Sequence, residues 1–420
     1  MNSEIERRIK QIKNGEIPDG YRSTKAGVLP KWDFVRLNQI AEPITKKVGN
    51  GIYETLSISA GIGFVNQAKK FGKELSGKQY EKYTVLNRGD FSYNKGNSKS
   101  YPQGCIYRLK DRGTAAVPNV FESFKIKKDS LDYYEQLFTS GYLNKQLSKK
   151  INHGVRDNGL LNLTEKDFYS CYVPHPPIAE QQKIAEILMQ CDKLIELYQN
   201  ETDELQKLKK ICFCKMFPKS GNDVPEWRFP QFTDAWEQRK LGDVATFING
   251  RAYSQPELLS SGKYKVLRVG NFYTNDSWYY SDLELGEKYY ADYGDLLYTW
   301  SATFGPHIWL GDRVIYHYHI WKIDLSNQLE KQFAVQLLEQ DKANILSSKN
   351  GSTMVHITKE GMEQKDVIIP PSTKEQQEIG AFFQQLDNLI TLHQRKLAEM
   401  EKQKKSLTQL LLTGIVRVNV

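Results

Sequence analysis

A five-residue motif occurs twice in the chain and shows that one unit is written twice. Residues 180–184 read Glu-Gln-Gln-Lys-Ile and residues 375–379 read Glu-Gln-Gln-Glu-Ile, an offset of 195 (375 minus 180). Each copy follows a proline pair and begins a long stretch of apolar periodicity. Self-similarity at a fixed offset is the signature of a duplicated structural unit, so any fold proposed for this chain must contain two copies of one arrangement.

The repeat extends upstream of the motif at a slightly wider offset of 204 or 205. Trp32 and Leu37 fall on Trp236 and Leu241, and the turn Gly89-Asp90 falls on Gly294-Asp295. Each half is therefore a globular module followed by a helix.

Composition allows packed domains and points to a partner for the first half. The chain has 420 residues, of which 40% are hydrophobic and 12% aromatic, enough for two to four cores. The formal charge is +8, but residues 1–170 carry 29 − 18 = +11 and residues 228–368 carry 15 − 18 = −3. Excess positive charge is typical of proteins that bind nucleic acid or an acidic surface, although a merely basic protein remains an alternative.

Neither a signal peptide nor a membrane-spanning run of about 18 apolar residues is recognisable, so we expect a cytoplasmic protein with no membrane partner. Five cysteines make an odd number, and we expect reduced packing residues and no metal site.

The periodicity divides the chain into six segments. Residues 1–30 predict an amphipathic helix, with Ile5, Ile9 and Ile12 on one face, and a lead-in. Residues 31–173 and 236–369 alternate short strand-like runs with turns, with helices expected at 131–150 and 329–346. Residues 218–235 hold three prolines and predict a linker. Residues 174–217 and 370–420 predict the two long helices, the second with Ser372 and Glu375 able to form a capping box.

The two long helices carry matching apolar seams with a 3.5-residue repeat, which predicts that each packs against a helical partner. Lys209 and Lys404 interrupt the seams at equivalent places. An antiparallel pair would relate the two halves by an approximate two-fold axis. The residues predicted to pair the helices are Ile184, Leu188, Ile195 and Leu205 in the first, and Ile379, Phe383, Leu386, Ile390, Leu397 and Leu407 in the second.

This order of segments resembles the specificity subunit of type I restriction-modification enzymes. The resemblance rests on the proline pairs followed by the two Glu-Gln-Gln motifs, on the turn at 294–297, and on the linker sequence Trp-Arg-Phe-Pro at 227–230 that precedes Trp236. It spans nearly the whole chain, and the twofold repetition of the motifs in order makes it specific. The N-terminal segment departs from the pattern, because the second half has no obvious copy of it.

The resemblance implies an α+β fold in which two mixed α/β target recognition domains are separated by two long helices that pair as an antiparallel coiled coil, with a pseudo-two-fold internal repeat. It implies a DNA reader without catalytic activity, in which each domain binds half of a bipartite double-stranded site and the helices set the spacer. Two methyltransferase subunits would dock on it and two restriction subunits would join. This chain would then hold no cofactor, and S-adenosylmethionine, ATP and Mg²⁺ would belong to the partner subunits.

Candidate DNA contacts follow from residue chemistry, since Arg and Lys suit guanine or phosphate and Asn and Gln suit adenine. The candidates are Lys69, Lys70, Lys73, Tyr93, Asn94, Lys95, Asn97, Ser98, Lys99, Arg156 and Asn158 in the first module, and Arg251, Arg268, Asn271, Thr299, Trp300, Ser301, Thr303 and Ser352 in the second. The alternatives are solvated loops for the charged residues, a core position for Trp300, and a structural role for part of the pair Arg268 and Asn271.

Catalytic motifs are missing from the sequence. There is no Asn-Pro-Pro-aromatic or Asp-Pro-Pro-aromatic turn of an adenine methyltransferase and no phosphate-binding Gly-x-x-x-x-Gly-Lys-Ser/Thr loop. Glu363-Gln364-Lys365 matches part of a nuclease motif that arises readily by chance, and His317-Tyr318-His319 has no evident third metal ligand. The runner-up function is a single-chain DNA endonuclease or modification enzyme with an unrecognised catalytic site, and a third is a coiled-coil scaffold.

Overall fold

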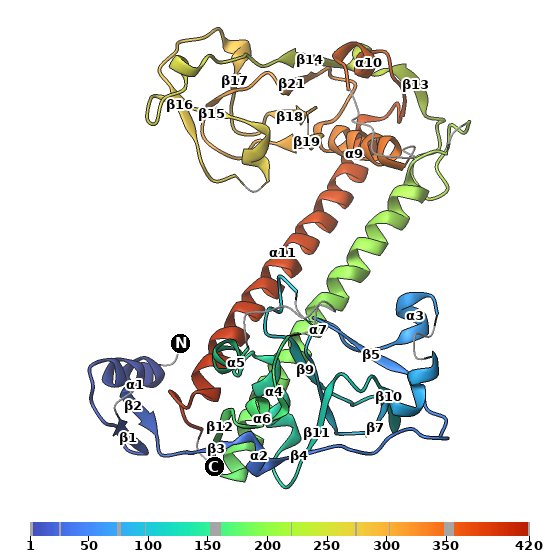
Figure 1. The fold of residues 1–420 in the computed structure, drawn as a ribbon. Helices are drawn as coiled ribbons and strands as arrows, with labels where there is room; N and C mark the ends of the chain where they lie inside the picture. Colours follow the sequence, from blue (N-terminus) through green and yellow to red (C-terminus); the bar gives the residue numbers. More distant parts are fainter. Residues whose placement is uncertain are drawn as a thin grey trace. The chain divides into compact units, whose positions relative to one another are not determined.

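A computed structural model describes residues 3–24, 27–73, 77–96, 98–151, 161–219, 221–273, 275–301, 303–347 and 357–418. The chain folds into two compact units. Unit 1 comprises residues 1–197 and 397–420, and unit 2 comprises residues 198–396. Each unit contains one strand-rich module and part of each long helix (Figure 1).

Unit 1 begins with helix α1 (Ser3–Lys13) and a hairpin of β1 (Tyr21–Thr24) and β2 (Gly27–Pro30). Module 1, which we define as residues 31–173, follows. Its elements are β3 (Asp33–Arg36), α2 (Leu37–Ile40), β4 (Ala41–Pro43), β5 (Leu56–Ser59), β6 (Gly63–Asn66), α3 (Gln67–Phe71), β7 (Thr84–Asn87), β8 (Phe91–Asn94), β9 (Cys105–Arg108), β10 (Thr114–Val117), β11 (Glu122–Ile126), α4 (Leu131–Thr139), α5 (Asn144–Lys150), α6 (Glu165–Tyr169) and β12 (Tyr172–His175).

The main sheet of module 1 has the order β4-β11-β8-β9, with every neighbour antiparallel. Its core is aromatic: Phe91 and Phe124 pair across β8 and β11, and their rings stack 5.5 Å apart. Helix α4 packs against β9 and completes this core.

Module 2, residues 236–369, repeats this plan with the sheet order β14-β21-β18-β19, and α9 packs against β19 as α4 packs against β9 (Figure 1). Its elements are β13 (Glu237–Lys240), α8 (Leu241–Val244), β14 (Ala245–Asn249), β15 (Tyr264–Leu267), β16 (Tyr279–Ser281), β17 (Tyr290–Ala291), β18 (Leu296–Thr299), β19 (Gly305–Ile308), β20 (Val314–Tyr316), β21 (Ile320–Leu325), α9 (Lys331–Ser347), α10 (Lys359–Glu363) and β22 (Asp366–Ile369). Module 2 also contains a second four-stranded sheet, with the order β16-β15-β20-β17.

The expected helix at 131–150 is wrong in one respect, because it is two helices. Gly141 adopts φ +76° between α4 and α5, a left-handed conformation that ends a helix and that glycine tolerates best. The amphipathic helix expected within residues 1–30 and the helix expected at 329–346 are confirmed as α1 and α9.

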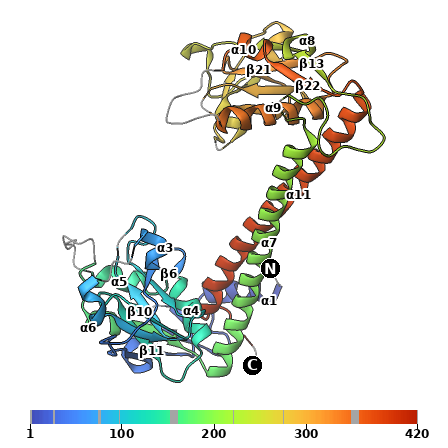
Figure 2. The same cartoon turned by 90° about the vertical axis from the view of Figure 1, so that its right-hand side faces the viewer.

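The two long helices are α7 (Ile178–Met216) and α11 (Thr373–Leu412), and they pair antiparallel as the seams predicted. The two helices lie side by side in both views (Figures 1 and 2). In unit 2, Tyr198 of α7 lies against His393 of α11, with ring centroids 5.9 Å apart, and further along α7 the Lys209 ammonium binds the Asp387 carboxylate at 2.5 Å. All ten predicted pairing residues are buried or half-buried. Ile184 and Leu188 pack into the core of module 1, and Ile379 and Phe383 pack into that of module 2.

The ion pairs between the two long helices follow the internal repeat of the sequence. In unit 1, Lys404 binds Asp192, and in unit 2, Lys209 binds Asp387. Lys404 and Asp387 are the copies of Lys209 and Asp192 at the offset of 195, so each pair is the other with its helices exchanged. Such reciprocity is what an approximate two-fold axis within one chain requires. Among the described residues, no helix combines the length and apolar character needed to span a bilayer.

Candidate nucleic-acid interface

The repeated motif fixes each module to its long helix. In unit 1, the Glu180 carboxylate is fully buried and accepts hydrogen bonds from the Trp32 indole Nε1 at 3.0 Å and from Arg417 Nε at 3.0 Å and Nη2 at 2.6 Å. A buried carboxylate is costly unless it is paired and hydrogen-bonded, and here both requirements are met.

Unit 2 contains the same anchor. Glu375 is 1% exposed and accepts from the Trp236 indole Nε1 at 3.2 Å and from Arg228 Nε and Nη2 at 2.7 and 2.8 Å. The expected capping box therefore forms only in part, because Ser372 Oγ accepts from the Glu375 amide while the Glu375 carboxylate faces Arg228 and Trp236. The anchoring role was not predicted, although the repeated tryptophans at 32 and 236 were the signal for it.

The glutamine after each anchor joins the helix to the strand-rich part of the module. Gln181 receives the Ser130 amide at 3.0 Å and donates to Asp129 Oδ1 and to the Pro176 carbonyl, both at 3.0 Å. Gln376 likewise receives the Glu330 amide at 2.8 Å and donates to the carbonyls of Gln328 and Pro370. Both glutamines are fully buried, so they position the module and do not contact DNA.

The strand directions bring several loops of module 2 to one edge of the main sheet. Strands β14 and β18 end where β21 and β19 begin, with Asn249 opposite Trp321 and Thr299 opposite Gly305. The loops after Asn249 and Thr299 and the turn before Ile320 therefore meet there. The chain leaves the other edge at Leu325 to reach Gln328 and Glu330, which bind Gln376. We call the first edge the distal edge, since the anchor lies at the other one.

Module 1 has the same distal edge. Strands β4 and β8 end, and β11 and β9 begin, with Pro43 opposite Phe124 and Asn94 opposite Cys105. The Gly-Asp turns of the repeat lie at the other ends of the strands: Gly89 and Gly294 take φ +99° and +89°, and Asp90 and Asp295 follow before β8 and β18. The anchors leave the distal loops free, and these loops carry exposed polar side chains such as Ser98 in module 1 and Thr303 in module 2.

Only part of the predicted loop of module 1 is available to a ligand. Tyr93 is wrong as a DNA contact: it is fully buried, stacks on Phe168 at 4.9 Å and donates to the Gln103 carbonyl at 2.7 Å. Burial raises the pKa of its phenol. Asn94 holds the loop by accepting from the Gly96 amide at 2.9 Å, and Lys95 binds Glu122 at 3.4 Å. Ser98 and Lys99 are exposed.

Basic residues flank this loop on α3. Lys69, Lys70 and Lys73 are exposed, as a phosphate-binding role requires. Burial raises the pKa of the Cys105 thiol, at the start of β9, to about 11. The Lys70 ammonium lies close enough to this thiol to offset part of the rise. Lys70 is therefore near the start of β9, at the distal edge. Asn97, Arg156 and Asn158, predicted for module 1, and Ser352, predicted for module 2, fall outside the described residues.

In module 2, Thr299 is wrong as a contact, because it is fully buried and its hydroxyl donates to the Gly305 carbonyl at 3.3 Å. Trp300 is half-buried, stacks on Trp321 at 5.8 Å and donates from Nε1 to the Tyr318 carbonyl at 2.9 Å. Ser301 is half-buried and Thr303 is exposed in the same loop.

The predicted cations of module 2 are already engaged. Arg251 binds Glu257 at 2.6 Å, and this contact holds the pKa of the Glu257 carboxyl at about 2. Arg268 lies over the Tyr279 ring at 4.2 Å and donates to the Ser277 carbonyl at 3.1 Å. Asn271 receives the Arg268 amide and donates to the Asn275 and Ser277 carbonyls, so both residues shape their loop.

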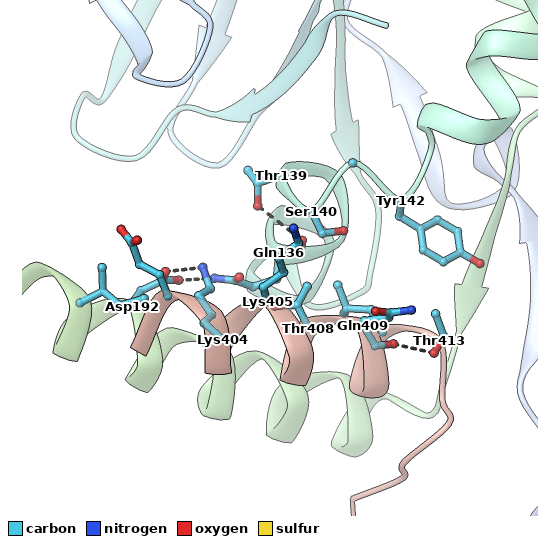
Figure 3. A pocket seen from close by; sticks show the side chains of 14 residues that line it. Gln136, Thr139, Ser140, Tyr142, Asp192, Lys404, Lys405, Thr408, Gln409 and Thr413 are labelled. Carbon is cyan, nitrogen blue, oxygen red and sulfur yellow. Dashed lines mark hydrogen bonds and ion pairs between the residues drawn. The ribbon is translucent and has the colours of Figure 1, made fainter. Parts of the chain in front are cut away.

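A groove of about 620 Å³ opens in unit 1 where α4 meets the long helices (Figure 3). On its wall, Asp192 accepts from Gln136 Nε2 at 2.7 Å while it also binds Lys404, so one carboxylate ties module 1 to both helices. Lys405 and Gln409 line the groove and are exposed. The groove lies on the helix side of module 1, and Thr139 and Gly141 at its end also border a second pocket that Tyr101 and Gln103 of the β8–β9 loop line.

The chain therefore has the architecture of a helix-linked recognition protein with an internal duplication. Each of its two strand-rich modules is held by a buried glutamate to the start of one of two antiparallel helices. A profile of the type I restriction modification DNA specificity domain matches residues 31–207 and again residues 233–402. The chain belongs to this family. Its two modules are target recognition domains, and a role in DNA binding follows from the family.

Relatives of similar length agree. The chain is 24% identical over 429 residues to the putative type I restriction enzyme MjaX specificity subunit of Methanocaldococcus jannaschii, covering 95% of this chain and 97% of the relative. It is 26% identical over 443 residues to the MjaIX specificity subunit of the same organism, covering 95% and 96%.

Solved structures share the fold. The type I restriction-modification system S subunit from M. genitalium superposes with a TM-score of 0.57 at 13% identity, covering 91% of this chain and 96% of that one. A chain from a study of complex assembly and conformational transition of the type I R-M system gives a TM-score of 0.54 at 16% identity, covering 92% and 99%.

Proposed function

We propose that this chain is the non-catalytic DNA-reading subunit of a type I restriction-modification complex, in which each module reads one half of a bipartite duplex site. The observation that carries the proposal is the duplicated anchor, which fixes one module to the N-terminal end of each helix through the same buried glutamate. A helix of 39 residues is about 58 Å long. The helices then set the number of unread base pairs between the half-sites.

The helix surface supports two identical docking partners. Leu194 and Leu197 on α7 are 43% and 50% exposed, and their copies at the offset of 195, Leu389 and Leu392 on α11, are both 46% exposed. Large exposed apolar side chains at equivalent places are typical of protein interaction sites. We assign each pair to one methyltransferase subunit, with two restriction subunits joining the assembly. S-adenosylmethionine, ATP and Mg²⁺ then act in those subunits.

The proposal is tested by co-expressing the chain with its methyltransferase subunit and mapping methylated sites in genomic DNA. We expect one bipartite motif with a fixed gap. Leu194→Ser together with Leu389→Ser should abolish co-purification of the methyltransferase subunit, whereas Leu310→Ser, which changes a 67% exposed leucine in module 2, should not. A map without a bipartite motif contradicts the reading of two half-sites.

The spacer role has its own test. Insertion of four residues into each of α7 and α11 at equivalent positions lengthens the helices by about 6 Å. At about 3.4 Å per base-pair step, the gap should grow by one or two base pairs while both half-sites stay the same. An unchanged gap contradicts the role of the helices as spacer.

Incubation of the purified chain alone with duplex DNA, Mg²⁺ and a methyl donor distinguishes the proposed function from the alternative of a single-chain endonuclease or modification enzyme. We expect neither cleavage nor methyl transfer, with the co-purified complex as the positive control for methylation. Activity of the isolated chain would favour the alternative.

A further inference from the structure

We infer that module 2 contacts DNA through an aromatic surface whose one cation, Arg251, is paired with Glu257, whereas module 1 contacts it through free lysines. The surface, which we call the aromatic edge, comprises Arg251, Tyr253, Trp300, His317, Tyr318 and His319. This inference rests on the proposed function and assigns residues that read the second half-site. The bases of duplex DNA, approached through a groove, are the ligand that such a surface fits, because imidazole, phenol and indole groups offer hydrogen bonds and flat faces without a net charge.

The aromatic edge is a connected structure. Arg251 pairs with the turn between β20 and β21, since its amide donates to the Tyr316 carbonyl at 3.2 Å and its carbonyl accepts the Tyr318 amide at 3.1 Å. Trp300 closes the other side: its amide donates to the His319 carbonyl at 3.1 Å, and its indole ring lies 5.0 Å from the His319 ring. The backbone of the turn is thereby fixed from both neighbouring loops.

Side chains of the aromatic edge remain accessible. Tyr318 is 39% exposed, and Arg251, Tyr253, Trp300, His317 and His319 are half-buried. The rings are packed together, with Tyr253 6.4 Å and Tyr318 4.4 Å from His317 between centroids. Rigid rings that are already ordered lose little side-chain entropy on binding, which favours their use as contacts.

Two polar atoms in the cluster lack a partner. Arg251 Nη1 and the Tyr253 hydroxyl are buried and form no hydrogen bond with any residue that the structure describes. A buried unsatisfied donor is costly, so each atom requires an acceptor from a water or a bound ligand.

The charges of module 2 argue against a phosphate-binding surface. Every lysine and arginine that the structure describes in this module has an acidic group, an aromatic ring or a carbonyl as its partner. Ion pairs hold Arg239, Lys240, Arg251, Lys263, Arg313, Lys322, Lys342, Lys359 and Lys365. Lys265, Arg268 and Lys288 lie over rings, and Lys331 binds the Gly294 carbonyl.

Module 1 differs in the state of its cations. Lys69, Lys73 and Lys99 are exposed and have no acidic partner among the described residues. Free cations of this kind release counterions when they bind phosphates. The two modules therefore bind the same DNA by different interactions, module 1 through charged contacts with phosphates and module 2 through aromatic contacts with bases. This difference agrees with the charges of +11 and −3 in the two parts of the chain.

The histidines of the edge are uncharged at neutral pH. Burial lowers the pKa of His317 to about 4, and the neighbouring His319 and Arg268 act in the same direction. Burial also lowers the pKa of His319. A neutral imidazole has one donor and one acceptor nitrogen, so it recognises a base edge without attracting phosphate.

The test measures duplex binding by the complex of this chain with its methyltransferase subunit, across a salt series, on DNA that carries the mapped bipartite site. For the double variant His317→Ala, Tyr318→Ser we expect about 10-fold weaker binding with an unchanged slope of log K against log salt. For Lys69→Ala, Lys73→Ala the slope should fall by about one for each phosphate that the variant no longer neutralises. Methylation mapping with the module 2 variant should show relaxed specificity in one half-site only.

An unchanged affinity and an unchanged methylation map for the module 2 variant would overturn the inference, and so would a reduced salt slope. Tyr318→Ser alone serves as a second variant, because the backbone hydrogen bonds of Tyr318 hold the turn and its side chain lies at the surface, so the substitution should leave the fold intact. Thermal unfolding of each complex checks this. Failure of the unmodified complex to bind duplex DNA would refute the proposed function, whereas normal binding with unaffected variants would refute the aromatic edge alone.

Discussion

The anchor between Arg228 and Glu375 gives the sharpest prediction about stability. Arg228→Ala removes two charge-assisted hydrogen bonds to Glu375, at 2.7 and 2.8 Å, and a third to the Asp234 carbonyl at 2.6 Å. The carboxylate is 1% exposed and keeps only the Trp236 indole as a side-chain donor. We expect the start of α11 to separate from module 2 more readily in this variant.

The magnitude follows from the burial of both partners. The side chains of Arg228 and Glu375 are 10% and 1% exposed, and removal of one member of a buried pair costs about 3 to 5 kcal/mol. The copy in unit 1 is less enclosed, since Arg417 is 27% exposed. Water reaches the arginine of that pair and screens it, so Arg417→Ala should cost about 1 to 2 kcal/mol less. Arg228→Lys should cost less than Arg228→Ala, because it keeps the charge and loses the bidentate geometry.

Hydrogen–deuterium exchange of the full chain resolves the two units separately. A loss of about 3 kcal/mol corresponds to more than 100-fold faster exchange in the most protected amides. For Arg228→Ala the acceleration should fall on β14, β18 and β21 of module 2, and for Arg417→Ala on β8 and β11 of module 1. Each variant is the control for the other.

An acceleration below 10-fold in module 2 for Arg228→Ala would refute the assigned role of the anchor. An equal effect of Arg417→Ala on modules 1 and 2 would refute it as well, because the two anchors would then not act on their own modules. A larger effect of Arg417→Ala than of Arg228→Ala would contradict the link between burial and cost.

Three further predictions concern unit 2. Gly380→Ala places a Cβ 2.8 Å from the Phe333 amide nitrogen and should destabilise the chain by about 1 to 3 kcal/mol in urea unfolding, whereas Ala185→Gly at the equivalent position should cost about 1 kcal/mol. Burial lowers the pKa of His307 from 6.5 to about 4, so the unfolded chain takes up the proton first as the pH falls; the free energy of unfolding should drop by about 3 kcal/mol between pH 6.5 and 4, and His307→Phe should flatten that dependence. A double-mutant cycle on Lys209 and Asp387 should give a coupling of about 0.5 to 1 kcal/mol, because the aspartate side chain is 41% exposed; zero coupling would assign the pair no role in register.

The long helices were predictable because their signal is repeated many times along the sequence. Each seam position adds to a 3.5-residue period, and the second copy repeats it, so the predicted burial of Ile195 or Ile390 did not depend on any single residue. The break at Gly141 was not predicted, because one glycine in an apolar-periodic stretch is compatible both with a helix and with its end.

The candidate contacts were predicted less well, since side-chain chemistry does not show whether a polar group is free. Tyr93 and Thr299 have suitable groups, but their strands carry them into the core. Asn94 accepts a hydrogen bond within its own loop, and Asn271 and Arg268 donate within theirs. The sequence shows which hydrogen-bonding groups are present, whereas only the fold shows which of them are already bonded to other residues of the protein.

The anchors also show why the two halves form one chain. Arg228 follows α7 in sequence but binds Glu375 at the start of α11, and Arg417 follows α11 but binds Glu180 at the start of α7. Each helix therefore ends in the segment that completes the module of the other. The tail is held in turn by the N-terminal segment, where the Tyr21 hydroxyl donates to the Ile415 carbonyl at 2.8 Å and the Gly20 carbonyl accepts from Arg417. The linker needs no such clamp because module 2 follows it directly, which accounts for the N-terminal residues that have no copy in the second half.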